Sequence, residues 1–270
     1  MLQTRIITAV ILAPLLLGLI VFAPSAAFAA VLAGVVALGA TEWLRLAGVT
    51  GRGATVAAVL ATVSVCAVLW FLAGARGPLL LGALAWWLFA LVGVLSFPAR
   101  ARWWDRRWVL LPSGLLVLPA AWLGLEQLQA DPRGPGMLLF LLFVVWSADI
   151  GAYFAGRAFG RRKLAVQVSP GKSWEGALGG TVLATVTGAA IARWSVPGGT
   201  MSLSAAVVAC VALVWVSVLG DLTESMLKRQ RDVKDSGSLL PGHGGVLDRV
   251  DSLLSTAPLW AVWVTCWLSA

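Results

Sequence analysis

The sequence predicts an all-α membrane protein: a polytopic transmembrane helical bundle of about nine spans with a cytoplasmic N-terminus. Of the 270 residues, 60% are hydrophobic and only 12% are charged, whereas a soluble domain is roughly half apolar and about a quarter charged. The mean hydropathy of +0.90 agrees with this composition. Too little charge remains to cover a surface that faces water. The sequence therefore excludes a soluble globular, a disordered or a disulfide-stapled protein.

Each predicted span is an apolar run of about 20 residues, the length that crosses the hydrocarbon core of a bilayer. The runs lie at residues 5–23, 26–46, 54–73, 78–97, 108–125, 136–155, 176–194, 202–221 and 248–268. Only short loops remain between them, so chemistry is expected in loops and at helix ends. The basic start and the small residues at 25–30 resemble a signal peptide. Because the first run has the length of a span and a second follows at once, we expect it to be retained.

The basic residues test this span count, because cytoplasmic loops of membrane proteins carry an excess of Lys and Arg. With the N-terminus inside, 17 of the 20 fall on cytoplasmic segments, and only Arg76, Arg133 and Arg193 fall on the other side. One missed helix would invert every later loop and destroy the asymmetry. The net charge of +8 is therefore mainly a sign of topology, and no nucleic-acid partner is expected.

The acidic residues divide the chain into two parts. Four of the 12 lie in residues 1–148 and eight in residues 149–270, all eight on the predicted cytoplasmic side or at its membrane boundary. We therefore predict an N-terminal transmembrane scaffold at 1–135, with about five spans. A C-terminal catalytic transmembrane region is predicted at 136–270, with cytoplasmic loops at 156–175 and 222–247.

The last of these loops and its flanking helix ends concentrate groups that bind metals. If the eighth helix continues beyond its apolar run, Asp221, Glu224 and Lys228 share one face. Asp248 and Asp251 lie one turn apart at the start of the ninth helix. Mg²⁺ takes one or two protein carboxylates together with substrate phosphate, so we predict Asp221, Asp248 and Asp251 as metal ligands. A single His with no nearby Cys disfavours zinc.

The same loop carries groups that suit a phosphate. Its basic residues include Lys228, Arg229, Lys234 and Arg249, and cationic side chains of this kind bind phosphate oxygens. Its glycines include Gly242, Gly244 and Gly245, where backbone N–H groups can approach an anion closely. Together with the carboxylates, these groups predict phosphoryl or nucleotidyl transfer. Each piece alone has an ordinary explanation, as a turn or as a surface salt bridge.

A second loop contains Ser-Pro-Gly-Lys-Ser-Trp-Glu-Gly at residues 169–176. It is not a Walker A motif, because Val166 stands where the first glycine belongs. Lys172 and Ser173 can still offer an amine and backbone N–H groups to a phosphate at a helix start. The alternative interpretation is a capped helix, with Ser173 as N-cap and Glu175 in the first turn. Both interpretations can hold together.

These two stretches resemble the phosphatidate cytidylyltransferase (CDP-diacylglycerol synthase) family. The signature reads Ser225-x-Leu227-Lys228-Arg229, Lys234-Asp235-x-Gly237 and Leu240-Pro241-x-His243-Gly244-Gly245-Val246-x-Asp248-Arg249-Val250-Asp251, with no departure at any position. Residues 149–164 and 169–176 also resemble that family. The resemblance covers roughly 145–255, and upstream it is only a likeness of several apolar spans.

The resemblance implies an enzyme of phospholipid biosynthesis that converts CTP and phosphatidate to CDP-diacylglycerol and pyrophosphate. It implies a multi-pass protein of the cell membrane with its active site on the cytoplasmic side. The protein is expected to act as a homodimer. It is expected to require Mg²⁺, and a second bound cation is possible. The residues expected to act directly are Asp221, Lys228, Asp248, Arg249 and Asp251. Those expected to bind substrate are Asp149, Lys172, Ser173, Glu224, Arg229, Lys234, Asp235, His243, Gly244 and Gly245.

Two alternatives stay open at this point. A related cytidylyltransferase would use another lipid phosphate, such as an archaeal ether lipid or a polyprenyl phosphate. A secondary transporter also carries intramembrane acids and broken helices, although its acids would be expected nearer to mid-span. A purely structural membrane protein explains the acidic and basic loop residues least well.

Overall fold

The computed structural model describes residues 2–131, 133–195, 201–239, 242 and 244–268. Long helices dominate this part of the chain. They are α1 (Leu2–Phe22), α2 (Ser25–Leu46), α3 (Arg52–Phe71), α4 (Arg76–Ser96), α6 (Arg107–Ala130), α7 (Gly134–Phe159), α8 (Trp174–Ser195), α9 (Leu203–Gln230) and α10 (Leu247–Leu268). The shorter elements are a 3₁₀ turn (Ala73–Ala75), α5 (Ala101–Trp104), β1 (Lys163–Ala165) and β2 (Ser169–Ser173).

The predicted all-α polytopic fold is confirmed. Among the described residues, 7 helices are long and apolar enough to cross a membrane. The two long helices outside this group are α1, whose apolar part Val10–Phe22 is shorter, and α10. The predicted number of nine spans and the orientation of the N-terminus stay predictions.

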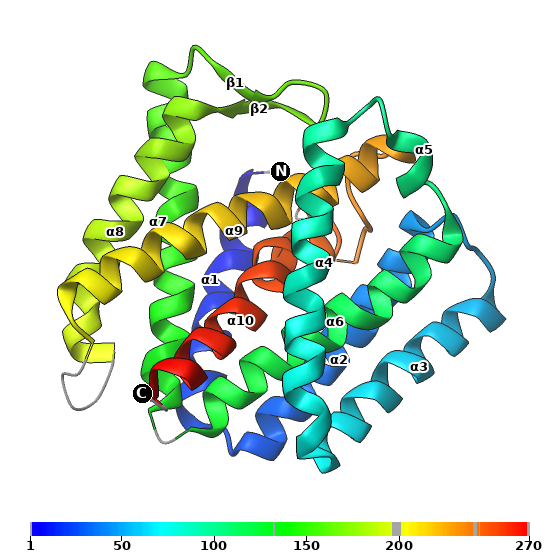
Figure 1. Ribbon diagram of the computed structural model, residues 1–270, viewed down its shortest axis with the longest axis horizontal. Helices are drawn as coiled ribbons and strands as arrows, with labels where there is room; N and C mark the ends of the chain where they lie inside the picture. The colour runs from blue at the N-terminus through cyan, green and yellow to red at the C-terminus, as the bar shows by residue number, and fades with distance from the viewer. Residues whose placement is uncertain (1, 132, 196–200, 240–241, 243, 269–270) are drawn as a thin grey trace.

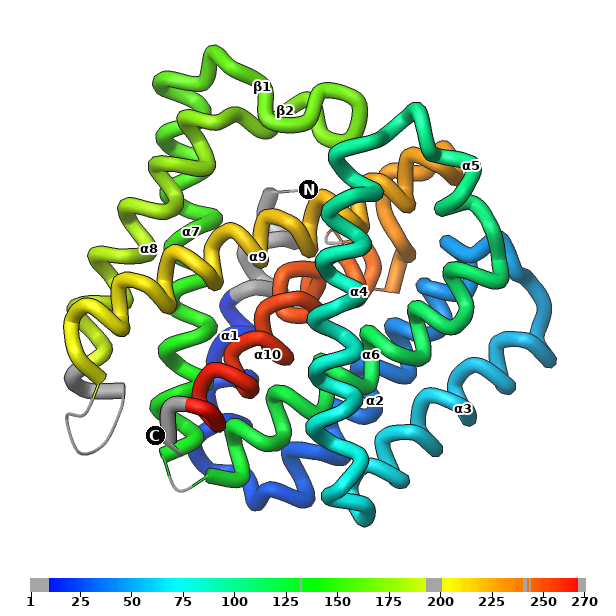
Figure 2. Tube along the Cα trace, in the orientation of Figure 1, coloured from blue at the N-terminus to red at the C-terminus, as the bar shows by residue number. Residues whose placement is uncertain are grey.

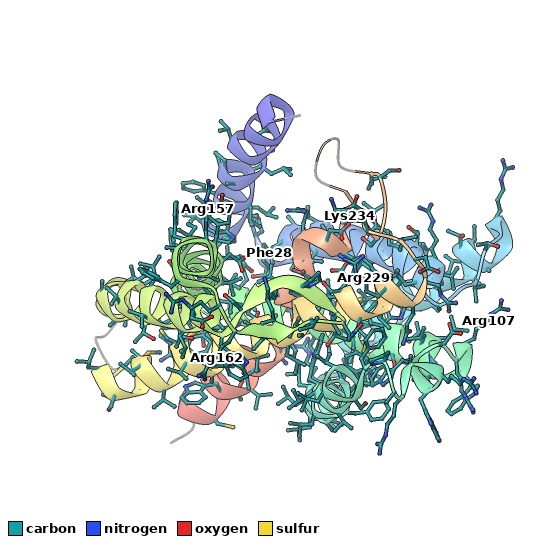
Figure 3. All side chains as sticks on the ribbon, turned by 90° about the horizontal axis from the view of Figure 1, so that it is seen from above. Phe28, Arg107, Arg157, Arg162, Arg229 and Lys234 are labelled. Carbon is teal, nitrogen blue, oxygen red and sulfur yellow. The ribbon has the colours of Figure 1, made fainter. Side chains whose placement is uncertain are left out.

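Two groups of helices meet at α9 and α10 (Figure 1). Helices α7 and α8 run side by side, and α9 crosses the bundle obliquely with α10 packed along it. Helices α2, α3, α4 and α6 form the other group. The trace in Figure 2 shows the hairpin, α5 and the α9–α10 connection at the same end of the bundle. Seen from above, α1 projects away from the other helices (Figure 3).

Glycines let α7 and α8 approach closely. A Cβ added at Gly180 would lie 2.5 Å from the carbonyl oxygen of Ala148, and one at Gly151 would lie 2.8 Å from that of Gly179. Small residues at such positions allow helix backbones to come together within a membrane. The close approach holds the part of α7 that carries Asp149 beside Gly179 and Gly180 of α8.

Buried tryptophans cross-link the helices through their indole N–H groups. Trp43 of α2 donates to the carbonyl of Leu110, Trp122 of α6 to that of Ala29, and Trp260 of α10 to that of Met137, at 2.8, 2.8 and 3.0 Å. A buried indole usually finds such a partner, because its ring is apolar and its N–H is not. These bonds join α2 to α6 and α10 to α7.

Helix boundaries differ from the sequence prediction at one functionally relevant place. The apolar run that predicts the eighth span ends at 221, whereas α9 continues to Gln230. Because the helix continues beyond its apolar run, Asp221, Glu224 and Lys228 lie on one face of α9, as predicted. The hairpin of β1 and β2 was not predicted, and the two strands pair antiparallel with Lys163 opposite Ser173.

Candidate active site

A pocket of about 220 Å³ lies between α7, α8, α9 and the hairpin. Its polar lining includes Asp149 from α7, Lys172 and Ser173 from β2, and Asp221 from α9. Four of the residues that the sequence predicts as functional, spread over more than 70 positions of the chain, therefore share one cavity.

The hairpin is fastened to the start of α8. Ser173 Oγ accepts a hydrogen bond from the backbone N–H of Gly176 at 3.1 Å, so the predicted N-cap is confirmed. The carboxylate of Glu175 accepts from the backbone N–H groups of Arg161 and Arg162 at 3.1 and 3.2 Å. These bonds hold β2 so that Lys172 reaches α9, where its Nζ lies 2.5 Å from Asp221 Oδ2.

Three acidic side chains from three helices interact electrostatically with one another and with this lysine. The charge of Asp149 interacts with those of Asp221, Lys172 and Arg249. The charge of Asp251, at the start of α10, interacts with those of Asp221, Lys172 and Asp149. Like charges at such a site repel one another.

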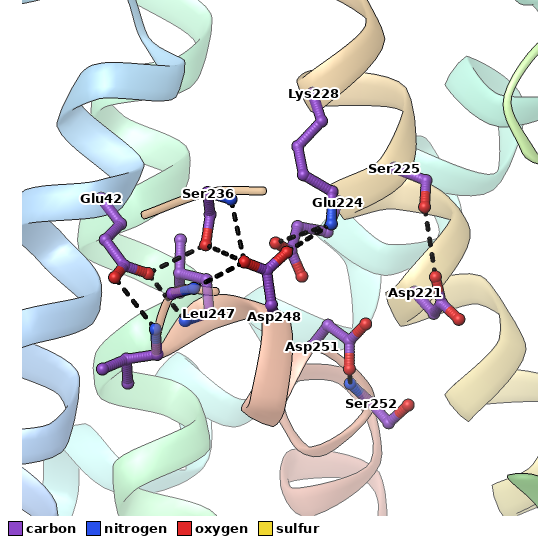
Figure 4. Close-up of polar contacts among 12 residues, drawn as sticks. Glu42, Asp221, Glu224, Ser225, Lys228, Ser236, Leu247, Asp248, Asp251 and Ser252 are labelled. Carbon is purple, nitrogen blue, oxygen red and sulfur yellow. Dashed lines mark hydrogen bonds and ion pairs between the residues drawn. The ribbon is translucent and has the colours of Figure 1, made fainter. Parts of the chain in front are cut away.

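A second charged cluster adjoins the first (Figure 4). Lys228 Nζ lies 2.6 Å from Asp248 Oδ1 and 3.3 Å from Glu224 Oε1. All three side chains are largely buried, with 13% of Lys228, 4% of Glu224 and 5% of Asp248 exposed. Glu224 also interacts electrostatically with Asp251, which makes the two clusters continuous.

The other oxygen of Asp248 organises the glycine-rich connection between α9 and α10. Asp248 Oδ2 accepts hydrogen bonds from Ser236 N at 2.9 Å, Ser236 Oγ at 3.0 Å and Gly245 N at 2.8 Å. Gly244 has a φ of 83°, a left-handed conformation that glycine adopts without strain. The N–H of Gly245, which the sequence predicts to face a phosphate, is directed at Asp248 in this structure.

The remaining predicted residues lie around the two clusters. Arg229 Nε donates to the carbonyl oxygen of Val168 in the hairpin at 3.3 Å. Lys234 and Asp235 are exposed on the α9–α10 connection, where Figure 3 shows Lys234. Arg249 is exposed, and its charge acts on Asp149. His243 lies outside the described residues.

The donor chemistry of the site suits Mg²⁺, because the facing groups are hard carboxylate oxygens. Within the described ranges, no three Asp, Glu, His or Cys side chains form a ready metal-binding group. Of the expected ligands, Asp221 faces Lys172 and Asp248 faces Lys228. Mg²⁺ commonly takes one or two protein carboxylates and completes its shell with water and substrate phosphate. The residues therefore fit an ion that binds together with a phosphate-bearing substrate.

The sequence prediction missed Glu42 of α2. This side chain is 3% exposed and its carboxylate contacts Ser236 and the start of α10. The available signal was an acid inside an apolar span, which is costly unless it is paired. Nothing local to residue 42 pointed to partners about 200 positions away.

Comparison with known proteins places these residues in a family. A profile of the cytidylyltransferase family matches residues 3–267. The phosphatidate cytidylyltransferase of Pseudomonas aeruginosa is 46% identical over 270 residues, covering 99% of each chain. That of Haemophilus influenzae is 40% identical and covers 97% of this chain and 98% of its own. That of Bacillus subtilis is 40% identical over 54% of this chain and 55% of its own.

Proposed function

Because the chain belongs to the cytidylyltransferase family, we propose that it makes CDP-diacylglycerol and pyrophosphate from CTP and phosphatidate. It is an enzyme that transfers a nucleotidyl group, and the names of its relatives support phosphatidate as the acceptor. The lipid product belongs to phospholipid biosynthesis. The observation that carries the proposal is the pocket that Lys172 shares with Asp149 of α7 and Asp221 of α9. Asp251 of α10 interacts electrostatically with all three of these residues.

The reaction forms one phosphorus–oxygen bond and breaks another. An anionic oxygen of the phosphatidate phosphate attacks the α-phosphorus of CTP. The bond from that phosphorus to the oxygen bridging to the β-phosphate breaks, and pyrophosphate leaves with the electron pair. A phosphate monoester is already anionic at neutral pH, so no strong general base is required. The protein must bring two anionic substrates together. Positioning of the substrates and electrostatic stabilisation supply most of the rate enhancement.

The basic residues reduce the repulsion between these anions. Lys172 and Lys228 point into the two acidic clusters, where phosphate oxygens would be alternative acceptors for their N–H groups. Arg229, Lys234 and Arg249 stand at the ends of the α9–α10 connection and on it. We assign them to the triphosphate or to the lipid phosphate.

The acidic residues Asp221, Asp248 and Asp251 would hold Mg²⁺, which compensates phosphate charge when bound. Asp149 and Glu224 are further carboxyl groups beside them. Ser173 caps α8 and so keeps Lys172 at the pocket.

The cytoplasmic face of the cell membrane is the proposed location of the pocket. The distribution of Lys and Arg along the sequence supports this orientation. The substrates agree with it, since CTP is a charged nucleotide and phosphatidate a membrane lipid. The family resemblance also supports a homodimer, which the mass of the purified protein in detergent would test.

The test is a substrate panel with the purified protein in detergent, CTP and Mg²⁺. We expect CDP-lipid and pyrophosphate with phosphatidate, and much slower turnover with an ether-lipid phosphate or a polyprenyl phosphate. Faster turnover of either alternative would reassign the lipid substrate. Absence of pyrophosphate with every lipid phosphate would contradict the proposal.

A further inference from the structure

We propose that Glu42 is a positioning residue for the proposed cytidylyl transfer. It acts from α2 on the loop that carries Ser236 and Gly245 and on the start of α10, which carries Asp248. This inference rests on the proposed function. It assigns a role in the reaction to the part of the chain that the sequence predicts as a scaffold.

The carboxylate of Glu42 binds the first turn of α10. Glu42 Oε1 accepts a hydrogen bond from Val246 N at 2.9 Å, and Glu42 Oε2 accepts one from Leu247 N at 2.8 Å. The first N–H groups of a helix have no partner within the helix and favour a negative charge. Glu42 therefore caps α10 from a different helix, immediately before Asp248 (Figure 4).

The same carboxylate holds the middle of the connection through Ser236. Ser236 is 6% exposed, and its Oγ lies 2.9 Å from Glu42 Oε2 and 3.0 Å from Asp248 Oδ2. A hydroxyl has one proton and can donate one strong bond at a time. If Asp248 turns toward a ligand, Ser236 keeps Glu42 as its acceptor. The loop thus has an anchor that does not depend on the position of Asp248.

Helix α2 also fixes the start of the connection. Arg231, the first residue after α9, donates from Nε to the carbonyl oxygen of Leu46 at 2.7 Å. The connection is therefore tied to the last turns of α2 at its beginning, in its middle at Ser236 and at its end at Val246. Only the middle and end contacts use Glu42, so its replacement would free the part of the loop next to Asp248.

Two glycines of the signature make room for Glu42. A Cβ added at Gly237 or at Gly245 would overlap the carboxylate of Glu42. The carboxylate thus enters the loop where side chains are absent. It accepts hydrogen bonds from the backbone N–H groups of Val246 and Leu247 as well as from the Ser236 hydroxyl. Such contacts fix the position of the chain next to Asp248, which pairs with Lys228.

The experiment compares Glu42→Gln with Glu126→Gln in the full-length protein in detergent. Glu126 of α6 is a matched control, because it is also a glutamate of the N-terminal part that is 3% exposed, and it has no contact with the loop among the described residues. For Glu42→Gln we expect kcat to fall roughly 10- to 100-fold, the usual effect of losing a residue that orients a ligand. Amide hydrogen exchange should quicken at Val246 and Leu247 and stay unchanged in α7. Glu126→Gln should have the kcat of the wild type and the same rates of amide hydrogen exchange at Val246 and Leu247.

A second variant keeps the inference testable if Glu42→Gln folds poorly. Ser236→Ala should lower kcat less, and the double variant should be no slower than Glu42→Gln alone, because both substitutions break one network. Folded Glu42→Gln protein with wild-type kcat and wild-type exchange at Val246 would overturn the role of Glu42. Because the wild type is assayed alongside, a wild type that forms no CDP-lipid would instead refute the proposed function.

Discussion

Lys172 Nζ lies 2.5 Å from Asp221 Oδ2, and this ion pair joins the hairpin before α8 to the face of α9 that carries Glu224 and Lys228. It brings together the two stretches of sequence that separately resemble one family. The pocket therefore depends on the hairpin as much as on the helices.

Replacing Lys172 tests whether this ion pair belongs to the reaction. Lys172→Met should lower kcat/KM for CTP by about 10²-fold or more, the usual effect of removing one electrostatic contact to a reacting group. Lys163→Met is the control, since Lys163 is exposed on the same hairpin. Steady-state rates at several CTP concentrations give the comparison. Equal rates for the two variants would contradict a role of Lys172 in the pocket.

Lys228 is predicted to stabilise the fold as well as to bind substrate. Lys228→Met would leave the buried carboxylates of Glu224 and Asp248 without their cation, which is expected to destabilise the protein by about 3–5 kcal/mol. The free energy of unfolding measured in detergent should be lower for Lys228→Met than for the wild type. Lys163→Met should have the same free energy of unfolding as the wild type. A Lys228→Met protein as stable as that control would show that the buried cluster needs no cation.

The α7–α8 contact is predicted to tolerate no added side chain at Gly180. Gly180→Ala would place a Cβ 2.5 Å from the carbonyl oxygen of Ala148, and overpacking of this kind costs about 1–3 kcal/mol. Activity should fall as well, because Asp149 follows Ala148. In Gly34→Ala the new Cβ meets nothing within 4 Å, so its unfolding should match the wild type. If Gly180→Ala and Gly34→Ala had the same stability to unfolding, the close approach of α7 and α8 at Gly180 would be contradicted.

The metal assignment predicts a strict dependence on Asp248 and on Mg²⁺. Asp248→Asn keeps one oxygen acceptor for Ser236 and Gly245 but loses the charge that pairs with Lys228. The variant should therefore fold with lower stability than the wild type and form no CDP-lipid. Chelation should stop the wild type, and added Mg²⁺ should restore it. CDP-lipid formation and thermal unfolding are measured together. Wild-type turnover by Asp248→Asn would remove this residue from the ligand set.

The sequence predicts the helices of this protein well, because the length of a span and the charge at its ends are local properties. Asp221, Glu224 and Lys228 are found on one helix as expected, and α10 begins one residue before Asp248. The hairpin was not predicted, because strands of 3 and 5 residues with Pro170 and Gly171 carry no periodic pattern. Glu42 was missed for a different reason, since its partner Val246 is 204 positions away.

Isotope tracing with the wild-type protein tests the central claim most directly. CTP labelled at the α-phosphate or at the γ-phosphate is mixed with phosphatidate and Mg²⁺. The account predicts that the α-label enters the lipid and that the γ-label leaves in pyrophosphate, in equal amounts. Asp221→Asn should transfer neither label. A lipid that carries the γ-label, or no labelled lipid at all from the wild type, would contradict attack at the α-phosphorus in this pocket.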